Sequence, residues 1–336
     1  MTEVLEILKR TTLKRLLNGL KVVLSYYYSR ISGNPIQWGY PISLAIEPTT
    51  SCNLRCPECP SGLRSFSRPT GMLKEEFFRK TIDEISPYTG YLTFYFQGEP
   101  YLNPSFLYMV ALASKKNMYT NTSTNAHYLT DENCKKTIES GLSRIIISID
   151  GTTQDTYEKY RIGGNLEKVL EGTKRLIEWK KKLKSKTPHI IFQYLVVRHN
   201  EHQLKDARKL AKDIGVDAIK FKTAQVYDFE GGNDLIPLNK KYARYIQNKE
   251  GKFEINNKLL NHCWKLWSAC VITWDGNVVP CCFDKDATHQ FGNLNTETFQ
   301  DVWQNTHYQS FRSALLKSRK EIDICANCSE GTKVWT

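Results

Sequence analysis

The sequence predicts an α/β fold built on a parallel sheet, with a small cysteine-rich domain at its C-terminal end and an amphipathic helix at its N-terminal end. Three observations support this prediction. From residue 40 onward, short apolar runs alternate with longer stretches of helical periodicity, which is the pattern of successive βα units. Six of the ten cysteines lie after residue 260. The first 39 residues carry apolar side chains at helical spacing.

The N-terminal segment, residues 1–39, is predicted to form a basic amphipathic helix. The apolar side chains on one side of it are Leu5, Leu13, Leu16, Leu20, Val23 and Leu24. The basic side chains on the other side are Arg10, Lys14, Arg15 and Lys21. Polar residues interrupt the apolar run, so it is too short to span a bilayer. Such a helix either lies on an anionic membrane surface, with Tyr26-Tyr27-Tyr28 following it, or docks on its own catalytic domain, which we favour.

Six strands and the helices between them fill residues 40–227. We expect the strands at 42–46, 91–96, 118–123, 144–149, 190–197 and 218–222. Helices such as 74–85, 130–140 and 166–184 lie between them. Six βα units are too few to close an eight-stranded barrel in the usual way. In such folds the loops at the carboxyl ends of the strands build the functional site.

The loop after the first strand carries three cysteines, Cys52, Cys56 and Cys59, spaced C-x₃-C-x₂-C. A four-iron cluster has four corners, so three thiolates leave one iron open to another ligand. Two other interpretations of the triplet are a structural zinc site and a disulfide-rich segment. Zinc normally takes four protein ligands in a structural site, and C-x₂-C is its more usual spacing.

Further motifs follow the next strands in order. The second strand leads into Gln97-Gly98-Glu99-Pro100, the third ends in Thr124-Asn125-Ala126, and the fourth ends in Ser148-Ile149-Asp150-Gly151, with Arg161 farther on. The fifth is followed by His199-Asn200-Glu201. Together with the cysteine triplet, these motifs resemble the radical S-adenosylmethionine (radical SAM) enzymes. Gln97 and Ala126 stand where that family has glycine.

The resemblance implies an open partial (β/α)6 barrel and a [4Fe-4S] cluster bound with S-adenosylmethionine (SAM). In that family an electron from the cluster splits SAM into methionine and a 5'-deoxyadenosyl radical. The resemblance gives Gly98 and Glu99 to the SAM amino group, and Ser148 and Arg161 to its ribose or carboxylate. Asp150 is a secondary candidate. The other interpretation of Arg161 is a surface salt bridge.

A polar linker, residues 228–260, leads into the C-terminal unit, residues 261–336. The spacing Cys263-x₁₂-Gly276-x₄-Cys281, with Cys325-x₂-Cys328 later, resembles the SPASM and twitch domains of many radical SAM enzymes. A complete SPASM domain continues with more cysteines, whereas this sequence has none after Cys328. We therefore predict one auxiliary [4Fe-4S] cluster on these four cysteines. A zinc ribbon on the same four is the alternative.

Three cysteines remain. Cys134 lies in a predicted helix and is expected to be inert. Cys270 and Cys282 lie beside the auxiliary site, and each is a candidate donor of a hydrogen atom to a substrate radical. Adjacent cysteines on a strand point in opposite directions, so Cys281 and Cys282 are not expected to bind the same cluster. A small buried residue is the alternative for Cys282.

Composition limits the partners and the location. The formal net charge of +12 is compatible with an anionic substrate, a nucleic acid or an acidic membrane surface. The densest basic run, 180–184, fits a solvated helix face, so we do not expect a nucleic-acid partner. Clustered cysteines without a cleavable signal indicate a reducing, cytoplasmic or membrane-peripheral location. The resemblance also implies an electron donor such as flavodoxin or ferredoxin.

Three functional classes are then open. The first is an enzyme that oxidises or epimerises a small polar molecule such as a sugar. The second modifies a peptide side chain. The third is a non-catalytic iron–sulfur electron carrier, which we disfavour because SAM-binding motifs would serve no purpose in it. Because no peptide-recognition domain is evident, we favour the small molecule.

Overall fold

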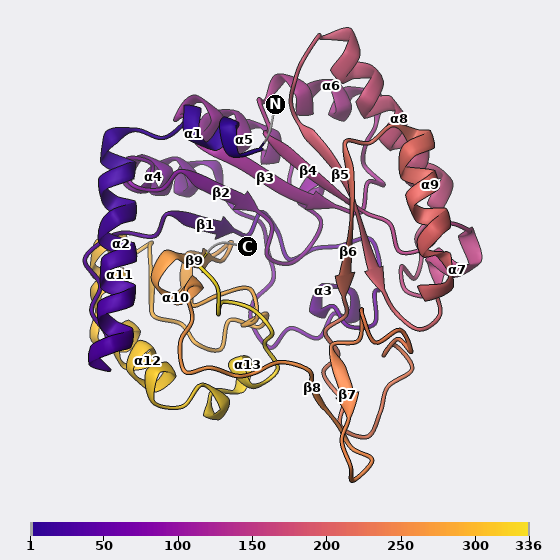
Figure 1. Cartoon of the computed structure of the whole chain (residues 1–336). Helices are drawn as coiled ribbons and strands as arrows, with labels where there is room; N and C mark the ends of the chain where they lie inside the picture. Colours follow the sequence, from indigo (N-terminus) through magenta and orange to yellow (C-terminus); the bar gives the residue numbers. More distant parts are fainter. Residues whose placement is uncertain (1–2, 335–336) are drawn as a thin grey trace.

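The computed structural model describes residues 3–334 and contains one large open sheet flanked by helices (Figure 1). Residues 1–2 and 335–336, at the ends of the first and last predicted segments, lie outside the described residues. Six parallel strands cross the sheet in chain order: β1 (Ser43–Ile46), β2 (Tyr91–Phe94), β3 (Tyr119–Thr124), β4 (Arg144–Ser148), β5 (His189–Val196) and β6 (Ala218–Thr223). The open parallel sheet confirms the predicted partial barrel.

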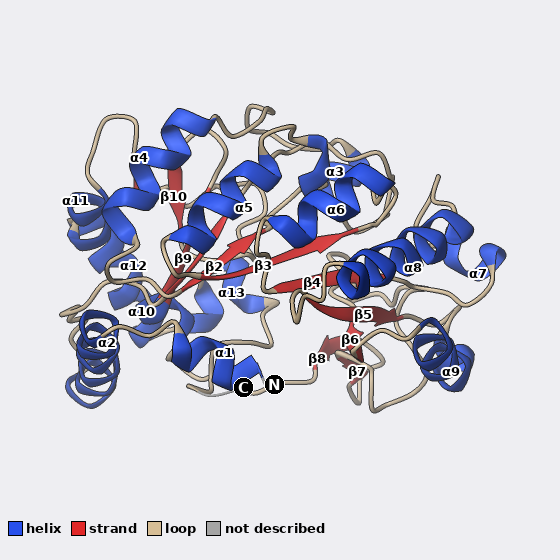
Figure 2. Cartoon of the chain, turned by 90° about the horizontal axis from the view of Figure 1, so that it is seen from above, coloured by secondary structure: helices blue, strands red, loops and turns tan. Residues whose placement is uncertain are grey.

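A layer of helices covers the outer face of these strands (Figure 2). The helices are α4 (Glu75–Ile85), α5 (Phe106–Lys115), α6 (Asp131–Glu139), α8 (Leu166–Lys182) and α9 (Leu204–Ile214). Each packs through an apolar stripe. In α4, for example, Phe78 and Ile82 are fully buried, and the Phe78 ring packs 5.5 Å from that of Phe94 in β2. This packing leaves the other face of the sheet and the carboxyl ends of its strands to form the site.

The C-terminal region continues the same sheet. β9 (Ala269–Ile272) pairs in parallel with β1, and β10 (Asn277–Val279) and β11 (Gly292–Asn293) follow as antiparallel neighbours. The helices of this region are α10 (Lys265–Ser268), α11 (Phe299–Gln304), α12 (Thr306–Lys317) and α13 (Asp323–Ala326). Trp267 and Trp303 are fully buried in the core that also contains Phe78. The predicted auxiliary domain therefore shares both sheet and core with the barrel.

The predicted linker is partly ordered into a hairpin. β7 (Tyr245–Gln247) pairs with β8 (Phe253–Ile255) in a separate two-stranded sheet. The hydroxyl of Tyr245 lies within hydrogen-bonding distance of the Val226 carbonyl and of the Asn327 side-chain oxygen, at 2.9 and 2.8 Å. Because Asn327 lies between Cys325 and Cys328, this hairpin ties the end of the barrel to the predicted auxiliary site.

Two helices precede the sheet, α1 (Glu3–Lys9) and α2 (Leu13–Ser32), and α2 begins after Thr12, whose hydroxyl caps it. α2 docks on the rest of the molecule, as we favoured. Tyr26, fully buried on α2, packs edge-to-face on Trp264 and Trp267 of the C-terminal region. The leucines of α2 mostly face away from this contact.

Candidate functional site

The three cysteines of the triplet lie on the loop between β1 and the short helix α3 (Pro60–Leu63). Within this loop the Leu54 side chain is buried, and the backbone N–H of Arg55 donates to the Ile162 carbonyl at 3.0 Å. Gly62 lets α3 approach closely, since a Cβ there would lie 2.6 Å from the backbone nitrogen of Cys56. The loop is therefore fixed on two sides at the carboxyl end of β1.

Nitrogen donors surround two of the thiols. The Cys52 Sγ accepts from the Leu54 backbone N–H at 3.5 Å and from the Asn125 Nδ2 at 3.8 Å. The Cys56 Sγ accepts from the Arg161 Nη1 at 3.7 Å. Burial raises the pKa of Cys52 to about 11 and also raises that of Cys56, which Arg161 opposes. Such buried thiols become thiolates when a metal replaces their protons, and the N–H donors then stabilise the sulfur charge.

The donor set therefore fits the implied [4Fe-4S] cluster. The thiols of Cys52, Cys56 and Cys59 are close enough to interact electrostatically, and all three border one small apolar cluster that includes Tyr160. Among residues 3–334, no three His, Cys, Asp or Glu side chains converge closely enough to hold a single metal ion. The fit rests on the chemistry of the thiols and their donors.

Glu99 lies in the turn after β2 and is only 2% exposed. Its carboxylate accepts hydrogen bonds from the Thr124 hydroxyl at 2.7 Å and from the backbone N–H groups of Asn125 and Tyr101 at 2.8 and 3.3 Å. Burial raises the pKa of Glu99 to about 7, although these hydrogen bonds oppose the rise. Three of about four acceptor positions are filled. A cationic ligand at the fourth would favour the ionised carboxylate.

Gly98 is required by packing in this structure. Its φ is +72°, and a Cβ there would lie 2.2 Å from the Thr49 carbonyl oxygen. Its backbone N–H donates to the Ser61 hydroxyl at 2.8 Å. Gly98 thus lets the turn that carries Glu99 lie directly against the cysteine loop.

Asp150, just after β4, forms a pair with Arg161, which follows α7 (Gln154–Glu158). The Arg161 Nε donates to the Asp150 carboxylate at 2.5 Å, while another nitrogen of the same guanidinium reaches Cys56. Asp150 is fully buried and also accepts from the Leu195 backbone N–H at 2.7 Å. Asp150 therefore holds Arg161 beside the cysteine loop, rather than leaving it as a surface salt bridge. Ser148, the last residue of β4, is buried two residues before Asp150.

Asn125 connects these motifs, a role that its sequence motif alone does not assign. Its backbone N–H binds Glu99, and its side-chain amide donates to the Asn53 side chain at 2.7 Å and to Cys52. Its place at the end of the third strand was the available signal. The next residue, Ala126, has a φ of +64°, which explains why glycine suits that position in related sequences.

The four C-terminal cysteines also come together, at the ends of separate elements. Cys263 precedes α10, Cys281 follows β10, and Cys325 and Cys328 belong to α13 and the turn after it. Cys263 interacts electrostatically with the other three. Burial raises the pKa of Cys325 to about 12 and raises those of Cys263 and Cys281.

A buried cation accompanies this second group. Arg319 is 1% exposed, and its guanidinium donates to the carbonyls of Glu330 and His262 at 2.7 and 3.4 Å. Its charge opposes the rise in pKa of Cys263 and Cys325. Four neighbouring thiols, two of which this guanidinium influences, fit a four-thiolate cluster, whose net charge is about −2 in its oxidised form.

The remaining cysteines occupy different environments. Cys134 is fully buried between α6 and α8, where its thiol lies 3.8 Å from the Gly172 carbonyl. Cys270 is buried on the helix side of β9 and interacts electrostatically with Arg312. This position does not support its predicted role as a hydrogen donor. Cys282 is instead exposed, and Lys265 and Cys328 lie near its thiol.

An accessible region lies between the two groups of cysteines. Tyr95, just after β2, is 43% exposed, yet Cys59 and Cys282 both act electrostatically on its hydroxyl. The Lys285 ammonium also interacts with both thiols and lies 3.4 Å from the Glu58 carbonyl. Lys285 could not be identified from the sequence, because a single lysine in a loop carries no motif.

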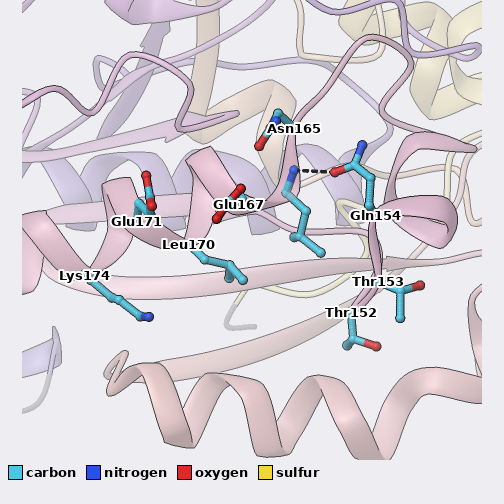
Figure 3. Close-up of a pocket in the computed structure, with 9 residues that line it drawn as sticks. Thr152, Thr153, Gln154, Asn165, Glu167, Leu170, Glu171 and Lys174 are labelled. Carbon is cyan, nitrogen blue, oxygen red and sulfur yellow. Dashed lines mark hydrogen bonds between the residues drawn. The ribbon is translucent and has the colours of Figure 1, made fainter.

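A surface pocket lies apart from the two groups of cysteines. This open pocket lies beside α7 and α8, with Gln154, Glu167 and Lys174 in its lining (Figure 3). The side chain of Gln154 accepts from the Leu166 backbone N–H at 2.8 Å, which joins the two helices. The described lining residues of this pocket include none of the predicted ligands, so we place the site at the cysteine loops.

Comparisons with known proteins agree with this geometry. A family model described as the radical SAM superfamily matches residues 46–218, and one described as the SPASM iron-sulfur cluster-binding domain matches residues 263–329. The chain is 27% identical over 317 residues to the tungsten-containing aldehyde ferredoxin oxidoreductase cofactor-modifying protein of Pyrococcus furiosus, covering 85% of this chain and 86% of that protein.

One further relative and one solved structure are also similar to this chain. The PqqA peptide cyclase of Bradyrhizobium diazoefficiens is 27% identical over 192 residues, which cover 56% of this chain and 48% of the cyclase. The solved structure of BtrN in complex with AdoMet and 2-DOIA superposes with a TM-score of 0.56 at 17% identity, covering 89% of this chain and 96% of BtrN. That likeness shows a shared fold.

Proposed function

The chain belongs to the radical SAM superfamily and carries a C-terminal SPASM domain, and from this premise we propose that it oxidises or epimerises a small polar molecule with an anionic group. The two domains imply a SAM-binding [4Fe-4S] cluster and an auxiliary iron–sulfur site. When bound, SAM and its cluster supply a 5'-deoxyadenosyl radical that removes a hydrogen atom from the substrate. Residues of this chain hold, orient and enclose the reactants.

We assign the ligands as the sequence predicted them. Cys52, Cys56 and Cys59 would bind the radical-generating cluster. Glu99 would accept from the SAM ammonium at its remaining acceptor position, beside the turn that Gly98 permits. Arg161, oriented by Asp150, would pair with the SAM carboxylate, and Ser148 would reach the ribose or carboxylate from the end of β4. Cys263, Cys281, Cys325 and Cys328 would bind one auxiliary [4Fe-4S] cluster.

One observation carries the proposal on substrate. Near Tyr95 lie two cations, Lys285 and Arg244, and one carboxylate, Glu58, which acts on Lys285. Lys285 lies near both Cys59 and Cys282, and Arg244 is close enough to Lys285 to lower its pKa, after the larger effect of burial. Within the described chain, the Arg244 Nε and Nη1 are buried without a hydrogen-bond partner. An anionic group of the substrate would satisfy them.

The relative from Pyrococcus furiosus supports a small molecule, because its name describes modification of a cofactor. Peptide modification is the second candidate, and the similarity to the PqqA peptide cyclase favours it. A non-catalytic electron carrier would not require the paired Asp150 and Arg161 next to the cysteine loop. Flavodoxin or ferredoxin is proposed as the electron donor for either substrate class.

Cys282 distinguishes oxidation from epimerisation. Oxidation requires the substrate radical to lose an electron and a proton, whereas epimerisation requires it to regain a hydrogen atom. Cys282 is exposed close to Tyr95, so a Cys282 thiol is available for that return. A Cys282→Ala variant should accumulate no epimer if the thiol is the donor, with Cys134→Ala as the matched control. Unchanged turnover would exclude this role.

The experiment for the proposed function is a 5'-deoxyadenosine assay with the anaerobically reconstituted protein. Pooled sugars, phosphorylated sugars, carboxylated small molecules and peptides would be supplied with SAM and reductant. We expect anionic small molecules to stimulate 5'-deoxyadenosine formation. When such a molecule carries deuterium at the reacting carbon, the label should appear in 5'-deoxyadenosine. Stimulation by peptides alone would establish the second candidate.

A further inference from the structure

The outer surface of α2 carries a continuous row of exposed apolar side chains. We define the outer face of α2 by these residues: Leu13, Leu16, Leu17, Leu20, Leu24, Tyr27, Tyr28 and Ile31. Leu13 is 71% exposed and Ile31 is 88% exposed. At 3.6 residues per turn the eight residues fall within about 120° of the helix circumference. Val4, Leu5 and Leu8 of α1 and the indole of Trp38 are exposed as well.

The opposite face of α2 makes the contact with the protein, and it is largely polar. Its buried residues are Arg15, Asn18, Val22, Ser25, Tyr26 and Ser29. Arg15 donates to the carbonyls of Ser86, Lys116 and Asn117 at 2.5 to 3.1 Å. Asn18 exchanges two hydrogen bonds with the Tyr40 backbone, at 2.8 and 2.9 Å. The helix is therefore fixed by specific polar contacts, and its apolar face is directed outward in that fixed orientation.

An exposed apolar face of this size indicates an interaction surface. α2 contains no acidic residue, and Lys14, Lys21 and Arg30 are exposed beside its outer face. Two copies packed face to face would bring these cations together without an acidic partner on α2. A bilayer with anionic headgroups complements both features, since it takes up the apolar side chains and attracts the basic flanks.

Aromatic residues occur at one end of the outer face, as expected for contact with the headgroup region. Tyr28 and Trp38 lie with their ring centroids 5.6 Å apart, and both are exposed. Tyrosine and tryptophan favour the membrane–water interface, where one end of the ring is apolar and the other is hydrated. Within residues 3–334, no helix combines the length and the apolar character needed to cross a bilayer.

We propose that the outer face of α2 binds the surface of an anionic bilayer and anchors the enzyme there. The docking contacts of α2 define the orientation that results. Tyr40, Ser86 and Asn117 all precede strands, so α2 lies at the amino ends of β1, β2 and β3. The cysteine loop lies at the carboxyl ends. α2 occupies an edge of the molecule in both views (Figures 1 and 2). The bound enzyme would therefore keep the loop of Cys52, Cys56 and Cys59 directed away from the lipid.

The test is flotation of the cluster-loaded protein with vesicles of phosphatidylcholine alone or with about one third phosphatidylglycerol. We expect binding to the anionic vesicles. The variant L16S/L20S/L24S should lose about 100-fold or more in partitioning, because three leucines no longer enter the interface. L183S/L238S/L260S is the matched control, since these three leucines are also exposed but lie elsewhere. It should partition like the unmodified protein.

A second variant separates charge from apolar contact. K14E/K21E keeps the outer face and should weaken binding to anionic vesicles about tenfold or more, with a smaller effect on neutral ones. Both variants should retain iron and SAM cleavage, because α2 lies far along the strands from the cysteine loop. Absence of binding to anionic vesicles would overturn the proposal. So would a dimer that L16S/L20S/L24S converts to a monomer, because the face would then join two copies.

Discussion

The two groups of cysteines in this chain differ in what surrounds them. Around Cys52 and Cys56 the neighbours are polar side chains from later parts of the barrel, among them Asn125 and Arg161. Glu99 accepts a hydrogen bond from the Asn125 backbone. Around the C-terminal four, the neighbouring cations are the buried Arg319, whose hydrogen bonds go to backbone carbonyls, and Lys265, which acts on Cys281 and pairs with Glu330. We propose that the side chains around the first group hold an exchangeable ligand and that those around the second support the cluster alone.

This difference suggests how one fold separates two uses of iron and sulfur. A set of three thiolates needs an outside ligand, so the surrounding strands supply hydrogen-bonding groups for that ligand. A set of four thiolates needs none, so burial and compensating cations such as Arg319 and Lys265 would be sufficient. The following predictions test this contrast, beginning with the largest expected effect.

Cys56→Ala should abolish SAM cleavage, since two thiolates cannot hold the radical-generating cluster. We expect 5'-deoxyadenosine formation to fall to background while about four irons per chain remain on the other site. Iron and sulfide analysis with the 5'-deoxyadenosine assay checks this. Cys134→Ala, which removes a buried thiol of neither group, should keep about eight irons. Loss of all iron from Cys56→Ala would show that the two sites are not independent.

Cys325→Ala should leave SAM cleavage intact and impair substrate oxidation. The radical-generating site remains, so SAM cleavage should continue, but substrate oxidation should decline by about 100-fold or more because the electron from the substrate has no acceptor. Product analysis beside the 5'-deoxyadenosine assay measures both. If substrate oxidation continued at the original rate, the auxiliary cluster would not be the acceptor.

Asp150→Asn should weaken SAM binding by about 10- to 100-fold, because the residue orients Arg161 without contacting SAM itself. The auxiliary site should keep its iron in this variant. Isothermal titration or the SAM-induced change in the cluster spectrum gives the affinity. Asp155→Asn on the exposed side of α7 is the matched control and should bind SAM normally. An unchanged affinity in Asp150→Asn would remove Arg161 from the SAM site.

A smaller effect is expected from pH. Burial raises the pKa of Glu99 to about 7 in the ligand-free protein. The SAM ammonium favours the ionised carboxylate, so SAM affinity should be greatest between about pH 7 and 8, where both groups are charged, and should fall up to about tenfold per unit below it. Glu99→Gln should bind more weakly and lose this dependence. An identical pH profile in the variant would contradict the assignment.

The sequence was sufficient for the strand order and for the cysteine loops, because strands, turns and metal-ligand spacings are local patterns. The shared sheet was not predictable in the same way: β9 pairs with β1 across more than two hundred residues, and no local pattern encodes that pairing. The orientation of α2 shows a second limit. Its leucine stripe suggested packing inward, yet Arg15 and Asn18 form the docking face because the carbonyls before β2 and β3 need donors.

The side chains around the site also divide into those that a local motif identifies and those that only tertiary contact reveals. Glu99 and Arg161 were identified by motif, whereas the support that Asn125 gives to Glu99 and Cys52 depends on tertiary contact. Cys270 is a sequence candidate because it lies beside the auxiliary site, but alternation along β9 turns it toward the helices. Cys282, which is exposed, was the better candidate of the two.

The most direct test of the central claim is electron paramagnetic resonance of the reduced protein with and without SAM. We predict two [4Fe-4S] signals in the unmodified chain, of which SAM shifts one. In C52A/C56A/C59A the SAM-sensitive signal should be lost and the other should remain unchanged. In Cys325→Ala the SAM-sensitive signal should remain. A SAM-induced shift in C52A/C56A/C59A would contradict the assignment of the open iron to the first loop.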